Sequence, residues 1–290
     1  MNKKKVVILI PTHRPNLIET DIISLAHLKK HLGKYDICFV IPKKINGDTF
    51  KSLGYRIKKV NNNFFGTLRR VNESLLNKEF YENFKDYEYL LLYQLDAIIL
   101  SNQLEMWLKS GYDFIAAPWF RPIIGHLTHQ RGQGVSGGNG GFSLRNIQKS
   151  IEVLSKVEKL AKRNSKNHYT RRLWFWLAVL TGKSHKIWLN APADNYPFNE
   201  DGFWSYEAPK YLNSFKVAPF SEALKFSFER YPKKCFELNG HKLPFGAHAW
   251  EKYDKDFWLS VLFDNKRNIR SHNSKKVAPV NHKCKKQKKM

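Results

Sequence analysis

Cysteine is scarce in this 290-residue sequence. Its three cysteines, Cys38, Cys235 and Cys284, are far apart along the chain. An odd number of widely spaced cysteines provides neither a disulfide framework nor the paired spacing of a zinc site. A disulfide-stapled secreted domain is therefore excluded, and a reducing compartment fits the sequence better than secretion.

Long hydrophobic runs are also missing. The apolar run Val6–Ile10 ends at Pro11, and the longest later run is Leu173–Leu180. A signal peptide needs an apolar core of about 7–15 residues, and a membrane-spanning helix needs about 20. We therefore expect a cytoplasmic protein without a transmembrane helix.

Acidic residues are few relative to basic ones, with 25 Asp and Glu against 50 Lys and Arg. Residues 265–290 hold ten Lys or Arg and no acidic residue, and we expect this basic tail to be mobile. The excess charge favours anionic partners such as nucleotides, lipid head groups, acidic glycans or nucleic acid. Because 42% of the residues are hydrophobic, wholesale disorder is excluded.

The first hundred residues alternate between strand and helix patterns. Short β-branched or apolar runs predict strands, and 3.6-residue apolar spacing predicts helices. The predicted strands are 6–11, 37–41, 55–60, 89–93 and, further on, 114–117 and 223–228; the predicted helices are 16–31, 67–76, 146–160 and 173–180, with a helical segment from Asn199 through Trp204 and a loop at 162–172. This alternation predicts an α/β fold with a mostly parallel sheet flanked by helices.

Polar residues follow two of these strands directly. Thr12, His13 and Arg14 come after the first strand, and Gln94 and Asp96 follow the fourth. Ligands of such sheets bind at the carboxyl ends of the strands. Asp96 has two interpretations, a turn or helix cap and a ligand for a hard cation that bridges two phosphates.

A glycine-rich run, 132–141, leads directly into Phe142-Ser143-Leu144-Arg145. Glycine allows backbone N–H groups to approach a ligand closely. The run lacks the phosphate-loop pattern and does not follow the first strand, so neither a P-loop nor a dinucleotide fingerprint is present. A flexible linker is the alternative interpretation.

Three further titratable residues are candidates for chemistry. Glu200 and Asp201 form an acidic pair in a basic protein, either as helix-start acids or as a general base for a hydroxyl nucleophile. His248 lies between two alanines and close to Trp250, where a packed histidine and a metal ligand are both open interpretations.

The order of these segments resembles the GT-A glycosyltransferase superfamily over about residues 5–260. More closely, it is similar to a largely bacterial GT-A-like family catalogued as a domain of unknown function. The resemblance rests on four segments in sequence: Tyr93-Gln94-Leu95-Asp96-Ala97, Ser136 to Arg145, Asn199-Glu200-Asp201 and Gly246-Ala247-His248.

The resemblance implies a role for each matching position. Asp96 matches the last residue of the strand-end Asp-x-Asp motif, and His248 matches a late histidine; together they would hold Mn²⁺ or Mg²⁺. Asp201, with Glu200 beside it, matches the catalytic base of inverting enzymes. The donor would contact residues after the strands and in the glycine-rich run: Thr12, His13, Arg14, Arg69, Arg70, Gln94, Asp96, Gly138, Asn139, Gly140 and Gly141.

Gln94 departs from the family pattern, because it stands where the first Asp is usual. One carboxylate fewer implies weaker metal binding. A metal-independent reaction also stays open, in which Arg14, Arg69 or Arg70 neutralises the leaving diphosphate.

The resemblance implies transfer of a sugar, from a UDP-linked donor, to a glycan or lipid-linked glycan acceptor with inversion, in cell-surface glycan or lipopolysaccharide synthesis. We expect one domain, 1–264, with a nucleotide-binding half to residue 100 and an acceptor half after it. The basic tail would allow peripheral attachment to an anionic inner membrane face. Two alternatives are a basic nucleic-acid-binding protein, although no specific nucleic-acid motif is present, and a nucleotidyltransferase with a similar sheet.

Overall fold

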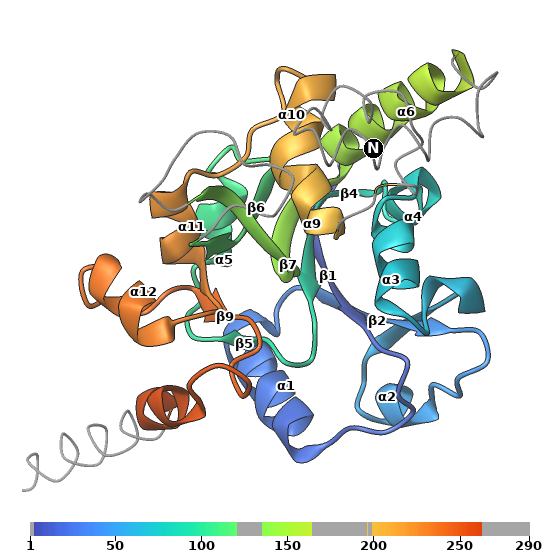
Figure 1. Cartoon of the computed structure of the whole chain (residues 1–290). Coiled ribbons are helices and arrows are strands. Elements are labelled where there is room, and N and C mark those ends of the chain that lie inside the picture. Colours follow the sequence, from blue (N-terminus) through green and yellow to red (C-terminus); the bar gives the residue numbers. More distant parts are fainter. Residues whose placement is uncertain (1–2, 121–134, 164–195, 197–198, 263–290) are drawn as a thin grey trace, which may run out of the picture.

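The computed structural model of the chain describes residues 3–120, 135–163, 196 and 199–262 (Figure 1). The strands are β1 (Lys4–Pro11), β2 (Asp36–Pro42), β3 (Arg56–Val60), β4 (Tyr87–Tyr93), β5 (Ile98–Ile99), β6 (Phe114–Trp119), β7 (Val135–Asn146), β8 (Ser227–Phe228) and β9 (Gly246–Ala247). The helices are α1 (Glu19–Leu32), α2 (Asp48–Ser52), η1 (Asn62–Phe64), α3 (Leu68–Leu75), α4 (Lys78–Glu82), α5 (Leu104–Leu108), α6 (Ile147–Arg163), α9 (Glu200–Gly202), the π-helical turn η4 (Phe203–Glu207), α10 (Ala208–Tyr211), α11 (Phe220–Phe226) and α12 (Pro232–Leu238).

A six-stranded sheet with the order β3-β2-β1-β4-β7-β6 forms the centre of the molecule. β1, β2, β3 and β4 pair in parallel, whereas β7 runs antiparallel to both of its neighbours. The mostly parallel α/β sheet predicted from the sequence is therefore confirmed. The division at residue 100 stays a prediction, and the sheet contains strands from both sides of it.

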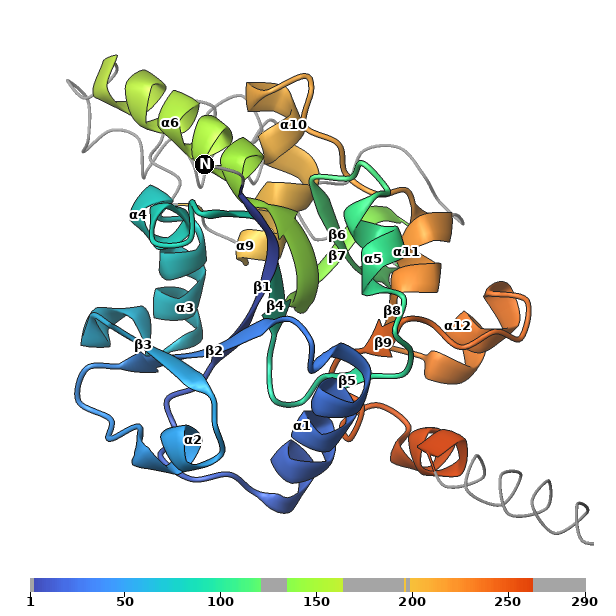
Figure 2. The ribbon, with the colours of Figure 1, turned by 180° about the vertical axis from the view of Figure 1, so that it is seen from behind.

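Both faces of the sheet are buried, which explains why its strands are nearly continuous apolar runs. Alternate side chains point to opposite faces. Val7 and Leu9 of β1 join the core formed with α3, α4 and α6, while Ile8 and Ile10 join the core formed with α1, α2, α5 and α11. Figure 1 and Figure 2 show these two layers of helices from opposite sides.

A second, three-stranded sheet has the order β5-β9-β8. β5 pairs antiparallel with β9, and β8 pairs parallel with it. Its strands have two residues each, and a separate apolar cluster that includes Phe228, Trp250 and Trp258 packs around it.

Two elements differ from the sequence-based expectation. The predicted strand 223–228 is wrong, because residues 220–226 form helix α11 and only Ser227 and Phe228 are extended. Pro219 precedes this helix, and a Glu222–Lys225 ion pair at 2.7 Å spans one of its turns; a window that begins at residue 223 misses both signals. The second half of the glycine-rich run is not a linker but part of β7, which pairs with β4 and β6.

Other predictions fall on residues that the structure does not describe. The helix 173–180 and the basic tail 265–290 lie outside the described residues. The predicted loop 162–172 begins inside α6, because this helix extends to Arg163. Residues 164–172 lie outside the described residues.

Candidate active site

The carboxyl ends of β1 and β4 meet at one edge of the sheet. The two strands pair in parallel with Leu9 opposite Leu92, so the residues that follow them emerge side by side. Thr12 is buried after β1, and Gln94 and Asp96 are partly buried after β4. This edge is where the sequence predicts a ligand site.

The small sheet determines which side chains surround His248, the residue after its central strand β9. Antiparallel pairing with β5 brings Asp96 to one side, and parallel pairing with β8 brings Glu229 to the other. Two backbone hydrogen bonds hold this arrangement: His248 N donates to Phe228 O at 2.9 Å, and Trp250 N donates to Asp96 O at 3.2 Å.

The imidazole of His248 is buried, and both of its nitrogens face acceptors. Nε2 lies 3.4 Å from Asp96 Oδ1 and 3.2 Å from Gln94 Oε1, while Nδ1 lies 3.5 Å from Glu229 Oε1. Burial lowers the pKa of His248, but the contacts with Asp96 and Glu229 outweigh it and raise the pKa to about 9. Burial raises the pKa of Asp96, and the hydrogen bond from His248 more than offsets this, so its net pKa is lowered.

The side chains in front of Nε2 fit a divalent cation. Within the described ranges, no three His, Cys, Asp or Glu side chains gather into a metal-binding group; here the third donor is the amide oxygen of Gln94. Carboxylate and amide oxygens suit Mg²⁺ and Mn²⁺. A Cβ at Gly141 would overlap His248 Nε2 and lie 2.6 Å from Gln94 Oε1, so glycine keeps the space beside these donors open.

Gly140, the residue before Gly141 in β7, contacts the acidic pair formed by Glu200 and Asp201. Gly140 N donates to Asp201 Oδ2 at 3.2 Å, and Gly202 N donates to Asp201 Oδ1 at 2.8 Å. Burial, followed by the charge of Glu200, raises the pKa of Asp201 to about 7. A carboxylate with this pKa is suited to accept a proton near neutral pH.

Glu200 has a different environment from Asp201. Its two carboxylate oxygens accept hydrogen bonds from both terminal nitrogens of Arg145, at 2.7 and 2.8 Å, and both side chains are buried. Arg145 also donates to Tyr81 Oη at 3.1 Å and to Ser143 Oγ at 2.9 Å. This bidentate pair fastens α9 to β7 and thereby fixes where Asp201 lies.

The residues predicted to contact the nucleotide after β1 belong to a local network. Thr12 Oγ1 accepts from Arg14 N at 3.2 Å, and the Arg14 guanidinium binds both oxygens of Asp21, at 2.8 and 2.9 Å. Asp21 also accepts from Ile18 N and so fixes the start of α1. His13 is exposed. These contacts connect Arg14 to α1 rather than to Asp96.

The predicted arginines of α3 lie on a helix that touches the acidic pair. Asn72 Nδ2 donates to Asn199 Oδ1 at 3.1 Å, and Glu200 N donates to Asn72 Oδ1 at 3.3 Å. Arg70 is exposed on this helix, and the side chain of Arg69 is outside the described part of the structure. α3 and α9 are therefore adjacent.

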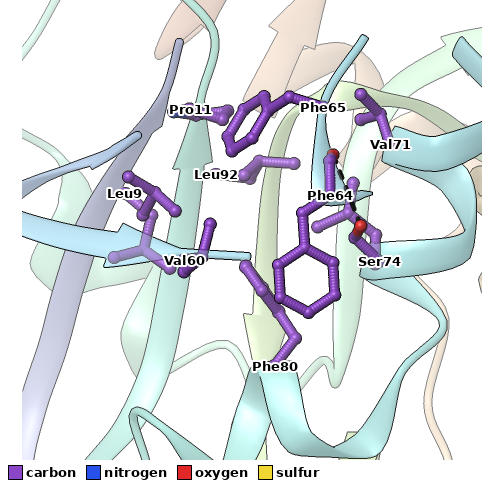
Figure 3. A pocket seen from close by; sticks show the side chains of 11 residues that line it. Leu9, Pro11, Val60, Phe64, Phe65, Val71, Ser74, Phe80 and Leu92 are labelled. Carbon is purple, nitrogen blue, oxygen red and sulfur yellow. Dashed lines mark hydrogen bonds between the residues drawn. The ribbon is translucent and has the colours of Figure 1, made fainter. Parts of the chain in front are cut away.

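A small apolar cavity lies between the sheet and α3 (Figure 3). Its volume is about 20 Å³, close to the space of one water. Figure 3 shows Ser74 turned to the backbone of Phe64, to which it donates a hydrogen bond at 3.4 Å. The cavity is lined by Leu9, Pro11, Val40, Val60, Phe64, Phe65, Val71, Ser74, Leu75, Phe80 and Leu92. None of the predicted site residues lines it, and we interpret it as a void in the core.

Sequence reasoning missed three residues of this region, Glu229, Arg145 and Asn72. Arg145 carried a signal, since it ends the segment Phe142-Ser143-Leu144-Arg145 and an arginine that becomes buried beside apolar residues needs a charged partner. Glu229 and Asn72 carried none, because nothing in their local sequence distinguishes them from surface residues.

The chain is an α/β protein in which polar side chains gather at the carboxyl edge of a mostly parallel sheet. The chain belongs to the family DUF5672, described as proteins of unknown function. The family model matches residues 54–248, so the match begins just before β3, ends at His248 and includes Asp96, Glu200 and Asp201.

Several solved structures of glycosyltransferases are similar to this chain. The apo form of GlyE from Streptococcus pneumoniae TIGR4 has 13% identity and a TM-score of 0.43, with 85% of this chain and 54% of that chain covered. Apo mouse xyloside xylosyltransferase 1 has 12% identity and a TM-score of 0.47, covering 85% and 97%. The galactosyltransferase LgtC, in complex with donor and acceptor sugar analogues, has 11% identity and a TM-score of 0.44, covering 83% and 86%.

This chain thus spans about half the length of GlyE. A search of the curated proteins finds no match. Among the described residues, no helix is both long and apolar enough to cross a bilayer.

Proposed function

We propose that the protein is a glycosyltransferase that moves a sugar from a nucleotide-sugar donor to a hydroxyl acceptor. One observation carries this proposal. Consecutive residues of β7, Gly140 and Gly141, lie against two chemically different groups: the buried Asp201 carboxylate, and the side chains of His248 and Gln94. Sugar transfer needs both, a base for the acceptor hydroxyl and a site that stabilises the departing diphosphate.

In this mechanism Asp201 removes the proton from the acceptor hydroxyl as that oxygen attacks the anomeric carbon. The bond to the diphosphate breaks on the opposite side of the carbon, so the configuration inverts. The pKa of about 7 lets Asp201 hold the proton it receives near neutral pH. Glu200 is not free to share this role, because Arg145 occupies both of its oxygens.

Gln94, Asp96 and His248 would hold a divalent cation. When bound there, Mn²⁺ or Mg²⁺ supplies positive charge that stabilises the diphosphate leaving group. The single carboxylate in this set is consistent with weak metal binding. Exposed Arg70, on the helix next to α9, is a candidate for neutralising the same diphosphate in its place.

The donor would lie along the carboxyl edge, from the residues after β1 to the glycines of β7. Asn139 Oδ1 accepts from Gly141 N at 2.9 Å, so its side chain is fixed beside that strand. By the resemblance the nucleotide is a uridine diphosphate and the acceptor a glycan or a lipid-linked glycan. The chain would then act in cell-surface glycan or lipopolysaccharide synthesis at the cytoplasmic face of the membrane.

Nucleotide binding tests the donor site first. The thermal stability of the full chain is measured with UDP, GDP, CDP and ADP, each with Mn²⁺ or with EDTA. A ligand at 100 times its dissociation constant adds about 2.7 kcal/mol of stability. We expect one diphosphate to stabilise the wild type with Mn²⁺ but not the Asp96→Asn variant. No stabilisation by any nucleotide would reject the donor site.

Product analysis then tests the reaction. With the matching sugar nucleotide and a panel of hydroxyl acceptors, we expect release of the nucleoside diphosphate. Asp201→Asn should keep nucleotide binding and lose transfer, and near-normal transfer by this variant would reject the base assignment. Release of pyrophosphate would indicate a nucleotidyltransferase, and salt-sensitive RNA binding without nucleotide binding would indicate the nucleic-acid alternative.

A further inference from the structure

Glu229 is a buried carboxylate that the proposed reaction does not use. It follows β8 directly, and its side chain is only 6% exposed. The adjoining Phe228 belongs to an apolar cluster with Cys235 and Trp250. A carboxylate in such surroundings needs a specific partner, because burial of an uncompensated charge is costly.

That partner is the imidazole of His248. Glu229 Oε1 lies 3.5 Å from Nδ1, on the side of the ring opposite Nε2. Nδ1 is a buried nitrogen without a hydrogen-bond partner among the described residues, and the Glu229 carboxylate, at ion-pair distance, is the charged group beside it. A carboxylate beside one ring nitrogen holds a hydrogen there, so the lone pair of the other nitrogen becomes available when a cation displaces its proton. Glu229 therefore directs Nε2 toward Gln94 and Asp96.

Glu229 also changes the charge of the site. The donor set in front of Nε2 has one carboxylate, Asp96, because the amide of Gln94 is neutral. Glu229 adds a second negative charge on the far side of the imidazole. Because the side chains of Glu229 and His248 are both buried, solvent screens the interaction between them only weakly.

We propose that Glu229 is a positioning residue for the cation site: it holds His248 with Nε2 toward Gln94 and Asp96, and it supplies negative charge that Gln94 does not. This inference rests on the proposed function, since it requires that the site bind a cation. It explains how a site with a single carboxylate among its direct donors can hold a divalent ion.

Mn²⁺ titration of the full chain tests this, with free Mn²⁺ followed by its EPR signal in the presence of the stabilising nucleotide. The variants are Glu229→Gln, which removes the charge at constant size, and Glu237→Gln, a matched control at an exposed carboxylate. We expect Glu229→Gln to weaken Mn²⁺ binding by roughly 10–100-fold, the range for partners of metal-ligating histidines. Glu237→Gln should bind as the wild type does.

Glu229→Asp serves as a second variant, because it keeps the charge and retracts it by one methylene. We expect its Mn²⁺ affinity to lie between those of the wild type and Glu229→Gln. Circular dichroism in EDTA confirms that each variant is folded, so that only folded proteins are compared. If Glu229→Gln did not fold, an affinity of Glu229→Asp equal to that of the wild type would overturn the inference.

Different results would reject the role of Glu229 and the existence of the cation site. Wild-type affinity in folded Glu229→Gln, with binding lost in Asp96→Asn, would overturn the role of Glu229 and leave the cation site intact. Absence of Mn²⁺ binding by the wild type itself would reject the cation site, and the role of Glu229 with it.

Discussion

Replacing Asp201 by Asn should change how the stability of the protein depends on pH. The pKa of Asp201 is raised from 3.8 to about 7 in the folded protein, first by burial and then by the charge of Glu200. The folded state therefore binds this proton more tightly than the unfolded state does. The stability that this proton contributes is fully present below about pH 4 and is lost as the pH rises to about 7.

The magnitude follows from the size of the shift. About three pKa units correspond to about 4 kcal/mol, at about 1.4 kcal/mol per unit. Between pH 5 and pH 8 the linkage relation assigns roughly 3 kcal/mol of this loss to Asp201. Asn cannot titrate, so the stability of Asp201→Asn relative to the wild type should rise by that amount over the same interval.

Urea unfolding of both proteins, followed by tryptophan fluorescence at pH 5, 6, 7 and 8, measures this difference. Asn offers one acceptor oxygen where Asp offers two, and the loss of a bond from Gly140 or Gly202 adds an offset of about 1 kcal/mol at every pH. The pH dependence of the difference is therefore the diagnostic quantity. A difference that stays constant from pH 5 to pH 8 would refute a raised pKa and remove the main physical reason for choosing Asp201 as the base.

Three further predictions concern other parts of the chain. Arg145→Met should lower the free energy of unfolding by about 3–5 kcal/mol, because it leaves the Glu200 carboxylate buried without its partner; a loss below 1 kcal/mol in urea unfolding would contradict this. Gly141→Ala should weaken Mn²⁺ binding at least about tenfold, because the added Cβ occupies the space beside His248 Nε2; unchanged affinity in a Mn²⁺ titration would be evidence against a cation there. Deletion of residues 265–290 removes ten positive charges, so co-sedimentation with phosphatidylserine vesicles at low salt should fall while nucleotide binding is kept; equal sedimentation of both forms would place membrane contact elsewhere.

Much of the central sheet could be predicted from the sequence, because its strands carry their signal locally. Both faces of a parallel sheet are buried, so β1, β2 and β4 are apolar runs that stand out in any short window. The polar residues that end these runs could also be placed, because parallel topology sends the carboxyl ends of the strands to one edge. Asp96 can be placed at this edge from the sequence alone.

β7 could not be predicted as a strand, because glycine disfavours strands in the absence of tertiary contacts. Its glycines are explained only by what approaches them. Gly140 lies where a Cβ would overlap Glu200, and Gly141 where it would overlap His248. Pairing with β4 and β6 on both sides stabilises the extended backbone that the glycine residues alone do not favour.

The sequence by itself determined the α/β class, the strands β1, β2, β3, β4 and β6, and several chemically capable side chains, Asp96, Asp201 and His248 among them. Their grouping was decided by the tertiary structure. β5 and β9 have two residues each and come from distant parts of the chain, so no local sequence pattern predicts their pairing. That pairing places His248 between Asp96 and Glu229. Two residues of β7 give the acidic pair different partners: Gly140 N donates to Asp201, whereas the Arg145 side chain binds Glu200. Residue type and periodicity are local properties, whereas the distances and pKa values of this site arise from long-range packing.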